Sequence, residues 1–400
     1  NMHIVFVCRE YPPSRRMGGI ASYIKETAED FVQKGHRVSV ICASDDTRKE
    51  AKGLVNGVRV IRLSKGDFII EGEEPGCAGL KKFRTIYRFY SYRKKIRETV
   101  FALHAENPID IIEVPEYGAE GYYLADINIP LVVRLHTPSL LDRKTQKLKS
   151  FKLRSFYAYW TGKKELAVVK KVRHITSCSN CLRDWFFQFV PQITSDIKTI
   201  YNPINMTNWI VSPSEYDELG ILYAGTVAEE KGVGDLIEAC NLLHKRGVEV
   251  QLTIAGKLGA YARNLKTLCE EAGYTWCKFV GHISREELKT LYAKSKISCF
   301  PSWWENLPLV CLEAMAVGNV VIGSSNGGMA EIIDDGVEGF LVEPQNPSLL
   351  ADKIETVLSL SKEDVFVLKG KAQARIYKQF SSDVIVGQLE EYYLSVINEY

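Results

Sequence analysis

Two carboxylates near the end of the chain stand eight positions apart, in surroundings that suit a binding site. Glu305 and Glu313 belong to the segment 302–313, which reads SWWENLPLVCLE. Pro308 suits the first turn of a helix, where a missing N–H costs nothing, so we expect Glu305 in a loop and Glu313 inside a helix. The apolar run before them, 297–301, predicts a buried strand that ends at a proline. The segment is therefore expected at the carboxyl edge of a sheet, where open α/β folds bind ligands, and the helix start would favour an anionic or polyhydroxyl ligand.

The elements that must position this segment alternate between strand-like and helix-like runs. Strand-like runs occupy 4–8, 37–42, 58–63, 109–114 and 131–135 in the first half, and 220–225, 248–255, 278–280, 296–300 and 319–323 in the second; helix-like runs occupy 20–34 and about 234–246. Such alternation predicts parallel sheets covered by helices. The expected fold class is therefore α/β, with two Rossmann-like, doubly wound parallel-sheet domains.

A polar stretch separates the two halves. Residues 201–218 contain two prolines and no sustained period, which is typical of a linker. We therefore expect an N-terminal domain over 1–203 and a C-terminal domain over 204–380. The last helical stretch, 381–400, is long enough to cross back to the N-terminal domain.

Composition favours a cytoplasmic globular protein. The 400 residues are 46% hydrophobic, which is enough for two full cores, and no apolar run approaches the roughly 18 residues that span a bilayer. The chain enters a strand at once, which does not suit a secretory signal. Ten cysteines are scattered through apolar patterns, as in a reducing compartment. The pair Cys178 and Cys181 lacks a second pair at metal-ligand spacing, so we expect no metal site there.

Charge divides the chain into unlike halves. Residues 1–200 carry 34 Lys and Arg against 22 Asp and Glu, a net of +12, and the remainder carries 17 against 27, a net of −10. Much of the excess lies in 81–97 and 143–173, where basic residues alternate with aromatic ones. These segments could lie on anionic lipid at the inner face of the membrane or form solvated helix faces, and the sequence leaves both open. Nucleic acid is not an expected partner, because no binding module accompanies the basic residues.

Two common uses of Rossmann-like units lack their fingerprints. The segment after the first strand, 9–19, contains a Gly-Gly pair but no G-x-G-x-x-G, which argues against a dehydrogenase. The chain also lacks G-x4-G-K-[ST], which argues against a P-loop ATPase.

The order and spacing of several short motifs resemble glycosyltransferase family 4, the retaining glycosyltransferases with two Rossmann-like domains facing a central cleft (GT-B). The E-x7-E motif matches Glu305 to Glu313, and the phosphate-binding Lys-Gly matches Lys231-Gly232. The N-terminal glycine loop matches Gly18-Gly19. Further matches are VRLH at 133–136, YNP at 201–203, FVGH at 279–282 and NGG at 326–328. The resemblance covers nearly the whole chain.

This resemblance implies a role for each motif. The C-terminal domain would hold a nucleotide sugar, and the N-terminal domain would receive the acceptor. Lys231 would neutralise the diphosphate, whose charge grows as it leaves, and the N–H groups of a glycine loop can approach the same phosphates. His136 would contact the donor sugar and position its anomeric carbon. The implied catalytic residues are His136, Glu305 and Lys231, and the implied donor-binding residues are Gly18, Gly19, Thr226, Lys231, Val280, Ile283, Asn306, Leu307 and Glu313.

One position departs from the family pattern. Thr226 stands where the family usually carries an arginine, and a hydroxyl can bond a phosphate but cannot neutralise it. We expect Arg15 or Arg16, which precede the glycine pair, to supply the second cation. No cofactor and no metal are expected, since Lys231 and the helix start can take the leaving-group charge.

The resulting hypothesis is a retaining hexosyltransferase that uses a UDP-sugar, with UDP-glucose as the first choice. Its acceptor would be a saccharide or a lipid-linked saccharide in polysaccharide synthesis. Two alternatives stay open at this point: a UDP-sugar 2-epimerase of the same architecture, and a non-catalytic partner of another glycosyltransferase. The Lys-Gly and E-x7-E spacing disfavours the epimerase, and Thr226 is the one feature that favours the non-catalytic partner.

Overall fold

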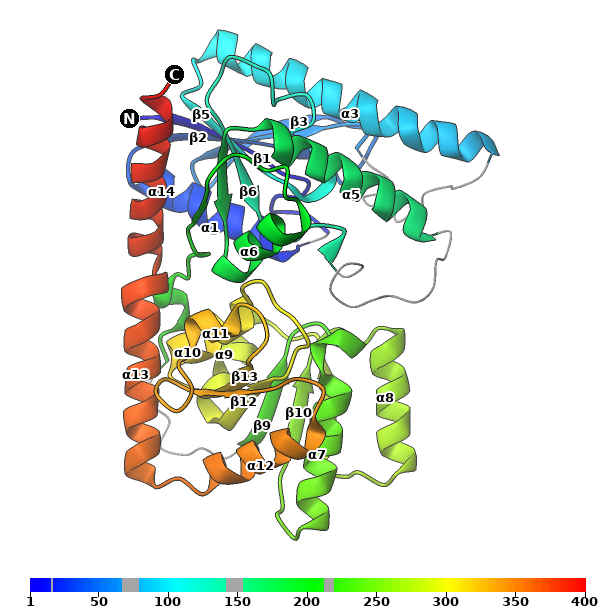
Figure 1. Cartoon of the computed structure of the whole chain (residues 1–400), viewed down its shortest axis with the longest axis vertical. Coiled ribbons are helices and arrows are strands. Elements are labelled where there is room, and N and C mark those ends of the chain that lie inside the picture. Colours follow the sequence, from blue (N-terminus) through cyan, green and yellow to red (C-terminus); the bar gives the residue numbers. More distant parts are fainter. Residues whose placement is uncertain (16, 67–78, 142–153, 212–218) are drawn as a thin grey trace. The chain divides into compact units, whose positions relative to one another are not determined.

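The computed structural model describes residues 1–15, 17–66, 79–141, 154–211 and 219–400 (Figure 1). The chain divides into two compact units. Unit 1 comprises Asn1–Pro203 with Ile385–Tyr400, and unit 2 comprises Ile204–Val384. The sequence predicts breaks after residues 203 and 380, and the units divide after Pro203 and Val384.

Unit 1 is built on one large sheet, which has eight strands among the described residues, in the order β3-β4-β2-β1-β5-β6-β7-β8. The strands are β1 His3–Val7, β2 Arg37–Ala43, β3 Ala51–Val55, β4 Val58–Leu63, β5 Ile111–Pro115, β6 Leu131–Leu135, β7 His174–Ser177 and β8 Ile197–Thr199. Every neighbouring pair is parallel except the edge hairpin of β3 and β4. All residues of β1, β5 and β6 are buried, as expected where helices cover both faces of a parallel sheet.

The helices of unit 1 come from both ends of the chain. They are α1 Gly19–Gln33, α3 Gly79–Glu106, the 3-10 turn η1 Tyr117–Ala119, α5 Arg154–Lys171, α6 Asn180–Phe189 and α14 Ser382–Ile397. The last of these packs Leu389, Tyr393 and Val396 into the same core cluster as Phe6 and Phe31. The C-terminal helix is therefore part of the core of unit 1.

Unit 2 repeats the architecture with six parallel strands among its described residues, in the order β11-β10-β9-β12-β13-β14. The strands are β9 Leu219–Ala224, β10 Leu252–Ala255, β11 Cys277–Gly281, β12 Ser295–Phe300, β13 Val320–Ser324 and β14 Phe340–Val342. The helices are η2 Met206–Trp209, η3 Glu229–Lys231, α7 Val233–Lys245, α8 Ala260–Glu271, α9 Arg285–Lys294, α10 Leu309–Val317, α11 Met329–Ile332, α12 Pro347–Leu358 and α13 Lys362–Phe380.

Both sheets reverse their strand order at one internal position. In unit 2 the chain runs outward from β9 to β11 and then returns to place β12 on the other side of β9. In unit 1 the same reversal places β5 beside β1. The loops that follow these four strands leave the sheet at the point where doubly wound folds bind their ligands. The predicted α/β fold class with two parallel-sheet units is confirmed.

Candidate active site

In unit 2, two loops at the carboxyl edge of the sheet are held together by backbone contact. Gly232 ends η3 with a φ of 73°, and a Cβ at this position would come within 2.1 Å of the carbonyl oxygen of Pro301. The Trp303 N–H donates to the carbonyl oxygen of Glu230 at 2.9 Å. The turn that carries Lys231 therefore lies directly against the loop that carries Glu305.

This contact brings two of the predicted catalytic residues together. Lys231 Nζ lies 2.7 Å from Glu305 Oε1, and the Ser302 hydroxyl donates to the same oxygen at 3.0 Å. The side chains of Lys231 and Glu305 are 28% and 19% exposed, so the ion pair is only partly screened by water. An ammonium has three N–H donors, which leaves Lys231 able to bind an anion while it stays paired with Glu305.

The loop after β12 is held closely enough to fix the backbone around Asn306. The Gly328 N–H donates to the Glu305 carbonyl oxygen at 2.7 Å, and a Cβ on Gly328 would come within 1.8 Å of the Asn306 carbonyl oxygen. Trp304 Nε1 donates to Asn306 Oδ1 at 2.9 Å. Leu307 is buried. The Glu305–Leu307 segment thus has a backbone position set before any ligand arrives.

Helix α10 begins one residue later than the sequence predicts. Pro308 has ψ 119° and is the residue before the helix, so the expectation that it forms the first helical turn is wrong. It still ends the loop, because its ring restricts φ and its missing N–H leaves no helical donor unpaired. Glu313 lies inside the helix as predicted, half-buried, with the Tyr292 hydroxyl 3.5 Å from Glu313 Oε2.

Three other predicted donor residues lie at or after the ends of β9 and β11 in unit 2. Thr226 follows β9 with an exposed side chain, and its carbonyl oxygen accepts a hydrogen bond from the Tyr223 hydroxyl at 2.5 Å. Val280 stands near the end of β11 and is 44% exposed, and half-buried Ile283 precedes α9. Strand β10 lies between β11 and β9, so Val280 and Ile283 lie apart from Thr226 along the carboxyl edge of the sheet.

In unit 1, Gly18 and Gly19 stand at the start of α1, which carries no acidic residue in its first turn. Both are exposed, and a Cβ on either would meet nothing within 4 Å. Packing within unit 1 therefore gives no reason for glycine here, whereas a ligand approaching the helix start would. Exposed Arg15 precedes them, with its backbone N–H bonded to Asp45 at 2.8 Å. Arg16 lies outside the described residues.

His136 lies at the carboxyl end of β6 and is buried. Its ring packs edge-on against Tyr23 of α1, with ring centres 4.9 Å apart. Burial, and then the nearby guanidinium of Arg134, lower the pKa of His136 well below its usual range. The imidazole is therefore neutral and can present either a donor or an acceptor to a sugar hydroxyl.

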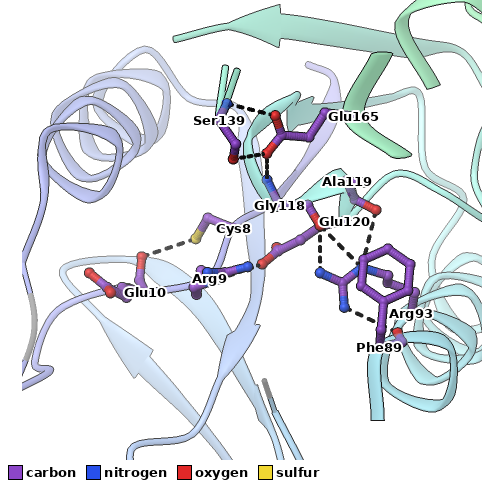
Figure 2. Close-up of polar contacts among 10 residues, drawn as sticks. All are labelled: Cys8, Arg9, Glu10, Phe89, Arg93, Gly118, Ala119, Glu120, Ser139 and Glu165. Carbon is purple, nitrogen blue, oxygen red and sulfur yellow. Dashed lines mark hydrogen bonds and ion pairs between the residues drawn. The ribbon is translucent and has the colours of Figure 1, made fainter. Parts of the chain in front are cut away.

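The sequence does not predict the buried charges beside His136. Glu116 and Glu120 follow the end of β5, Glu165 lies on α5, and all three are buried. Figure 2 shows how Arg93 of α3 and Glu165 of α5 hold the turn at Gly118–Glu120 from two sides. A run of acidic residues directly after a buried strand, EVPEYGAE at 113–120, is the signal that could have found this cluster.

Two further observations concern the whole described chain. Among the described residues, no three His, Cys, Asp or Glu side chains gather as metal ligands would. No described helix has both the length and the apolar character needed to cross a bilayer.

Comparison with known proteins defines the class. The chain is 27% identical to an uncharacterised glycosyltransferase of Methanocaldococcus jannaschii over 98% of both chains, and 24% identical to glycogen synthase of Mycobacterium tuberculosis over 98% of this chain and 95% of that one. Among solved structures, sucrose-phosphate synthase of Thermosynechococcus elongatus matches with a TM-score of 0.81 at 20% identity over the whole of both chains. Anabaena HepE in complex with UDP-glucose matches with 0.72 at 18% identity, over 99% of this chain and 100% of that one.

These similarities and the two-unit architecture define a glycosyltransferase of the GT-B fold. Residues 17–208 match the model described as Glycosyltransferase Family 4, and residues 207–373 match the one described as Glycosyl transferases group 1. The chain belongs to glycosyltransferase family 4. The findings do not support the epimerase alternative.

Proposed function

We propose that this chain transfers a hexose from a UDP-sugar, with UDP-glucose as the donor to test first, to a saccharide or lipid-linked saccharide in polysaccharide synthesis. The observation that supports this most is the contact of Lys231 with Glu305 at 2.7 Å, at the strand-order reversal of unit 2. The solved neighbour that carries UDP-glucose favours the same donor class, and the similarity to a glycogen synthase favours a saccharide acceptor.

In the proposed reaction, the bond from the anomeric carbon to the diphosphate breaks and a bond to the acceptor oxygen forms on the same face. The acceptor's proton passes to the departing phosphate oxygen, so the products are UDP and the elongated acceptor with its anomeric configuration retained. Lys231 stabilises the negative charge that grows on the diphosphate, and Thr226 adds a hydroxyl donor. Glu305 accepts hydrogen bonds from the sugar while the N–H groups of Asn306 and Leu307 stand beside it.

The remaining residues hold the two ends of the donor and need no metal ion in this proposal. Glu313 accepts from the ribose hydroxyls, and Val280 and Ile283 offer apolar contact to the base. Gly18 and Gly19 admit the phosphates to the start of α1. The neutral imidazole of His136 bonds a hydroxyl of the transferred sugar.

Calorimetry with UDP, GDP, UDP-glucose, UDP-N-acetylglucosamine and UDP-galactose tests the proposal, with slow donor hydrolysis followed in the same samples. We expect UDP to bind, one UDP-sugar to be hydrolysed, and EDTA to leave both unchanged. The anomeric coupling constant of the transferred sugar, read by NMR, decides whether configuration is retained. Failure of every nucleotide to bind would reject the enzyme and leave the non-catalytic partner.

We also propose that α3 makes peripheral contact with the anionic inner face of the membrane, from the cytoplasm. Its first turns expose Leu80, Phe83 and Tyr87 at 88%, 71% and 71%, on one helix face at i, i+3 and i+7. Exposed Lys81 and Arg84 flank them. Apolar side chains that enter the headgroup region beside basic ones suit such a surface. Of the second basic segment, 143–173, the part 143–153 lies outside the described residues.

Sedimentation with vesicles tests this contact. The protein is expected to sediment with phosphatidylcholine vesicles that contain phosphatidylglycerol. Each surface Lys or Arg contributes about 1 kcal/mol to the free energy of binding to anionic lipid, so high salt should reduce sedimentation. The double variant Phe83→Ser, Tyr87→Ser should remain in the supernatant. Phe366→Ser is the control, because Phe366 is 79% exposed but lies on α13, outside the proposed contact surface of α3. Equal sedimentation with neutral and anionic vesicles would overturn the proposal.

A further inference from the structure

Glu116 binds the backbone of the segment that carries His136. Its two carboxylate oxygens accept the N–H groups of His136 and Thr137, both at 2.6 Å. The side chain of Glu116 is fully buried. Only an ionised carboxylate presents two equivalent acceptor oxygens, and hydrogen bonds to such a charged group are among the strongest in proteins. The direction in which the His136 side chain leaves the backbone is therefore set by Glu116.

The ring of His136 is held from another side. Tyr23 packs against it, and the Tyr23 hydroxyl donates to the buried carboxylate of Glu113 at 2.9 Å. The Tyr393 hydroxyl of α14 donates to the same carboxylate at 2.6 Å. Glu116 thus acts on the backbone of His136 while Glu113 acts on the ring that His136 contacts.

Glu116 directly precedes η1. Two buried charges fix the turn at Gly118–Glu120 that follows (Figure 2). Arg93 donates to the carbonyl oxygens of Gly118 and Ala119, and these two residues adopt φ of 78° and 52°. Glu165 accepts the Gly118 N–H at 2.8 Å, and it also accepts both the N–H of Ser139 at 2.8 Å and its hydroxyl at 2.6 Å. Glu116 and Glu165 therefore link the turn after β5 to the loop after β6 at two places, His136–Thr137 and Ser139.

Ionisation of Glu116 lowers the stability of unit 1. Burial, and then the charge of Glu165, raise the pKa of Glu116 to about 8, and burial also raises the pKa of Glu165. A carboxyl group whose pKa rises on folding binds its proton more tightly in the folded state. The contribution of Glu116 to the free energy of unfolding therefore falls as pH rises from the pKa that Glu116 has in the unfolded chain toward about 8. Buried charges that lower stability are a reason to look for a functional role.

We propose that Glu116 is a positioning residue for glycosyl transfer, which acts by holding the backbone of His136, and that Glu165 and Arg93 act by holding the turn that carries Glu116. The proposal rests on the transferase function proposed above. It adds a group that the family motifs in this sequence do not include.

A double-mutant cycle tests whether Glu116 acts through His136. Glu116→Gln keeps the shape of the side chain but leaves one acceptor oxygen, so we expect transfer to slow by on the order of ten-fold or more. In a His136→Ala background, the same change should cause little further loss. Glu116→Asp, which keeps the charge and draws it back, should show the same coupling if Glu116→Gln does not fold.

Glu120→Gln is the matched control, because Glu120 is equally buried in the same turn and pairs with Arg9 at 3.4 Å instead. Its effect should have the same size in both backgrounds. An effect of Glu116→Gln that is likewise unchanged by His136→Ala would overturn the proposal and make Glu116 a stabilising residue only.

The pH profile gives a second readout. The charged or titratable groups around Glu116 are Glu165 on α5, Arg93 on α3, Glu120 in the same turn, and His136 after β6. Arg134 on β6 acts on His136, and Arg9 after β1 pairs with Glu120 and faces Glu165. We expect the wild-type rate to rise with pH as Glu116 ionises, and this rise to be lost in Glu116→Gln, whose amide resembles the neutral form. A rise of equal size in the variant counts against the proposal.

A third readout does not depend on activity. The imidazole nitrogen signals of His136, identified by their loss in His136→Ala, should shift in Glu116→Gln and stay in place in Glu120→Gln. If no variant and no wild-type sample transfers a sugar, the transferase function fails, and these signals still decide whether Glu116 sets the position of His136. Unmoved signals in Glu116→Gln would overturn that positioning.

Discussion

Lys231→Ala is expected to lower the rate of glycosyl transfer about a thousand-fold, the upper range seen when one preorganised stabilising group is removed from an active site. At the strand-order reversal of unit 2, the ammonium of Lys231 contacts Glu305, which is itself a predicted catalytic residue. Its loss would leave the departing diphosphate without neutralisation and leave Glu305 without this partner, next to an anionic ligand. Both consequences raise the energy of the transition state.

The measurement is kcat/KM for the donor, together with calorimetric binding of UDP. Lys353→Ala is the matched control, since Lys353 of α12 is also 28% exposed and also forms an ion pair, with Asp335 at 3.6 Å. Lys231→Arg should recover part of the rate because it restores the charge with a different geometry. A Lys231→Ala enzyme as active as the Lys353→Ala enzyme would remove Lys231 from the proposed mechanism.

His136→Ala should lower kcat about a hundred-fold and leave UDP binding unchanged. Its neutral imidazole is expected to bond the transferred sugar, so truncation removes a contact at the reacting centre and not at the nucleotide. UDP affinity and kcat measured on one preparation separate these two effects.

His174→Ala is the control for loss of a buried histidine. His174 is also buried, and burial also lowers its pKa. It is the first residue of β7, however, so it lies at the amino end of the strands, whereas His136 follows the carboxyl end of β6. Full turnover in His136→Ala, with UDP still bound, would exclude the role given to this imidazole. A protein that binds its partner but shows no turnover in the wild type would instead favour the non-catalytic role.

The strongest sequence predictions concern residues whose backbone surroundings are local. The segment 297–313 contains a strand end, a proline and a helix start, so its loop and helix could be predicted to within one residue. The contact of Lys231 with Glu305 could not, because it joins positions 74 residues apart through the approach of Gly232 to Pro301. Only the assembled sheet places β9 beside β12.

Glu116 and Glu165 were missed for a different reason. Charged residues are rarely buried, so an acidic residue after a strand, such as Glu116, or in a lysine-rich helix, such as Glu165, favours an exposed position. Their burial depends on N–H donors from the loop after β6, which the sequence does not place nearby. The edge strand β3 was also missed, since its residues are mostly exposed, although Asn56-Gly57 with φ of 49° and 83° is a typical two-residue hairpin turn.

Helix α14 has a consequence for how the protein is made. The Tyr393 hydroxyl reaches Glu113 across 280 positions of sequence, and Leu389 and Val396 complete a core begun by β1. During synthesis, residues 1–203 leave the ribosome long before the helix that closes their core. Unit 2 can therefore reach its folded state first, while unit 1 keeps apolar surface around Phe31 open until α14 has been made. A nascent chain that lacks α14 thus exposes the core of unit 1, which is the kind of surface that chaperones bind.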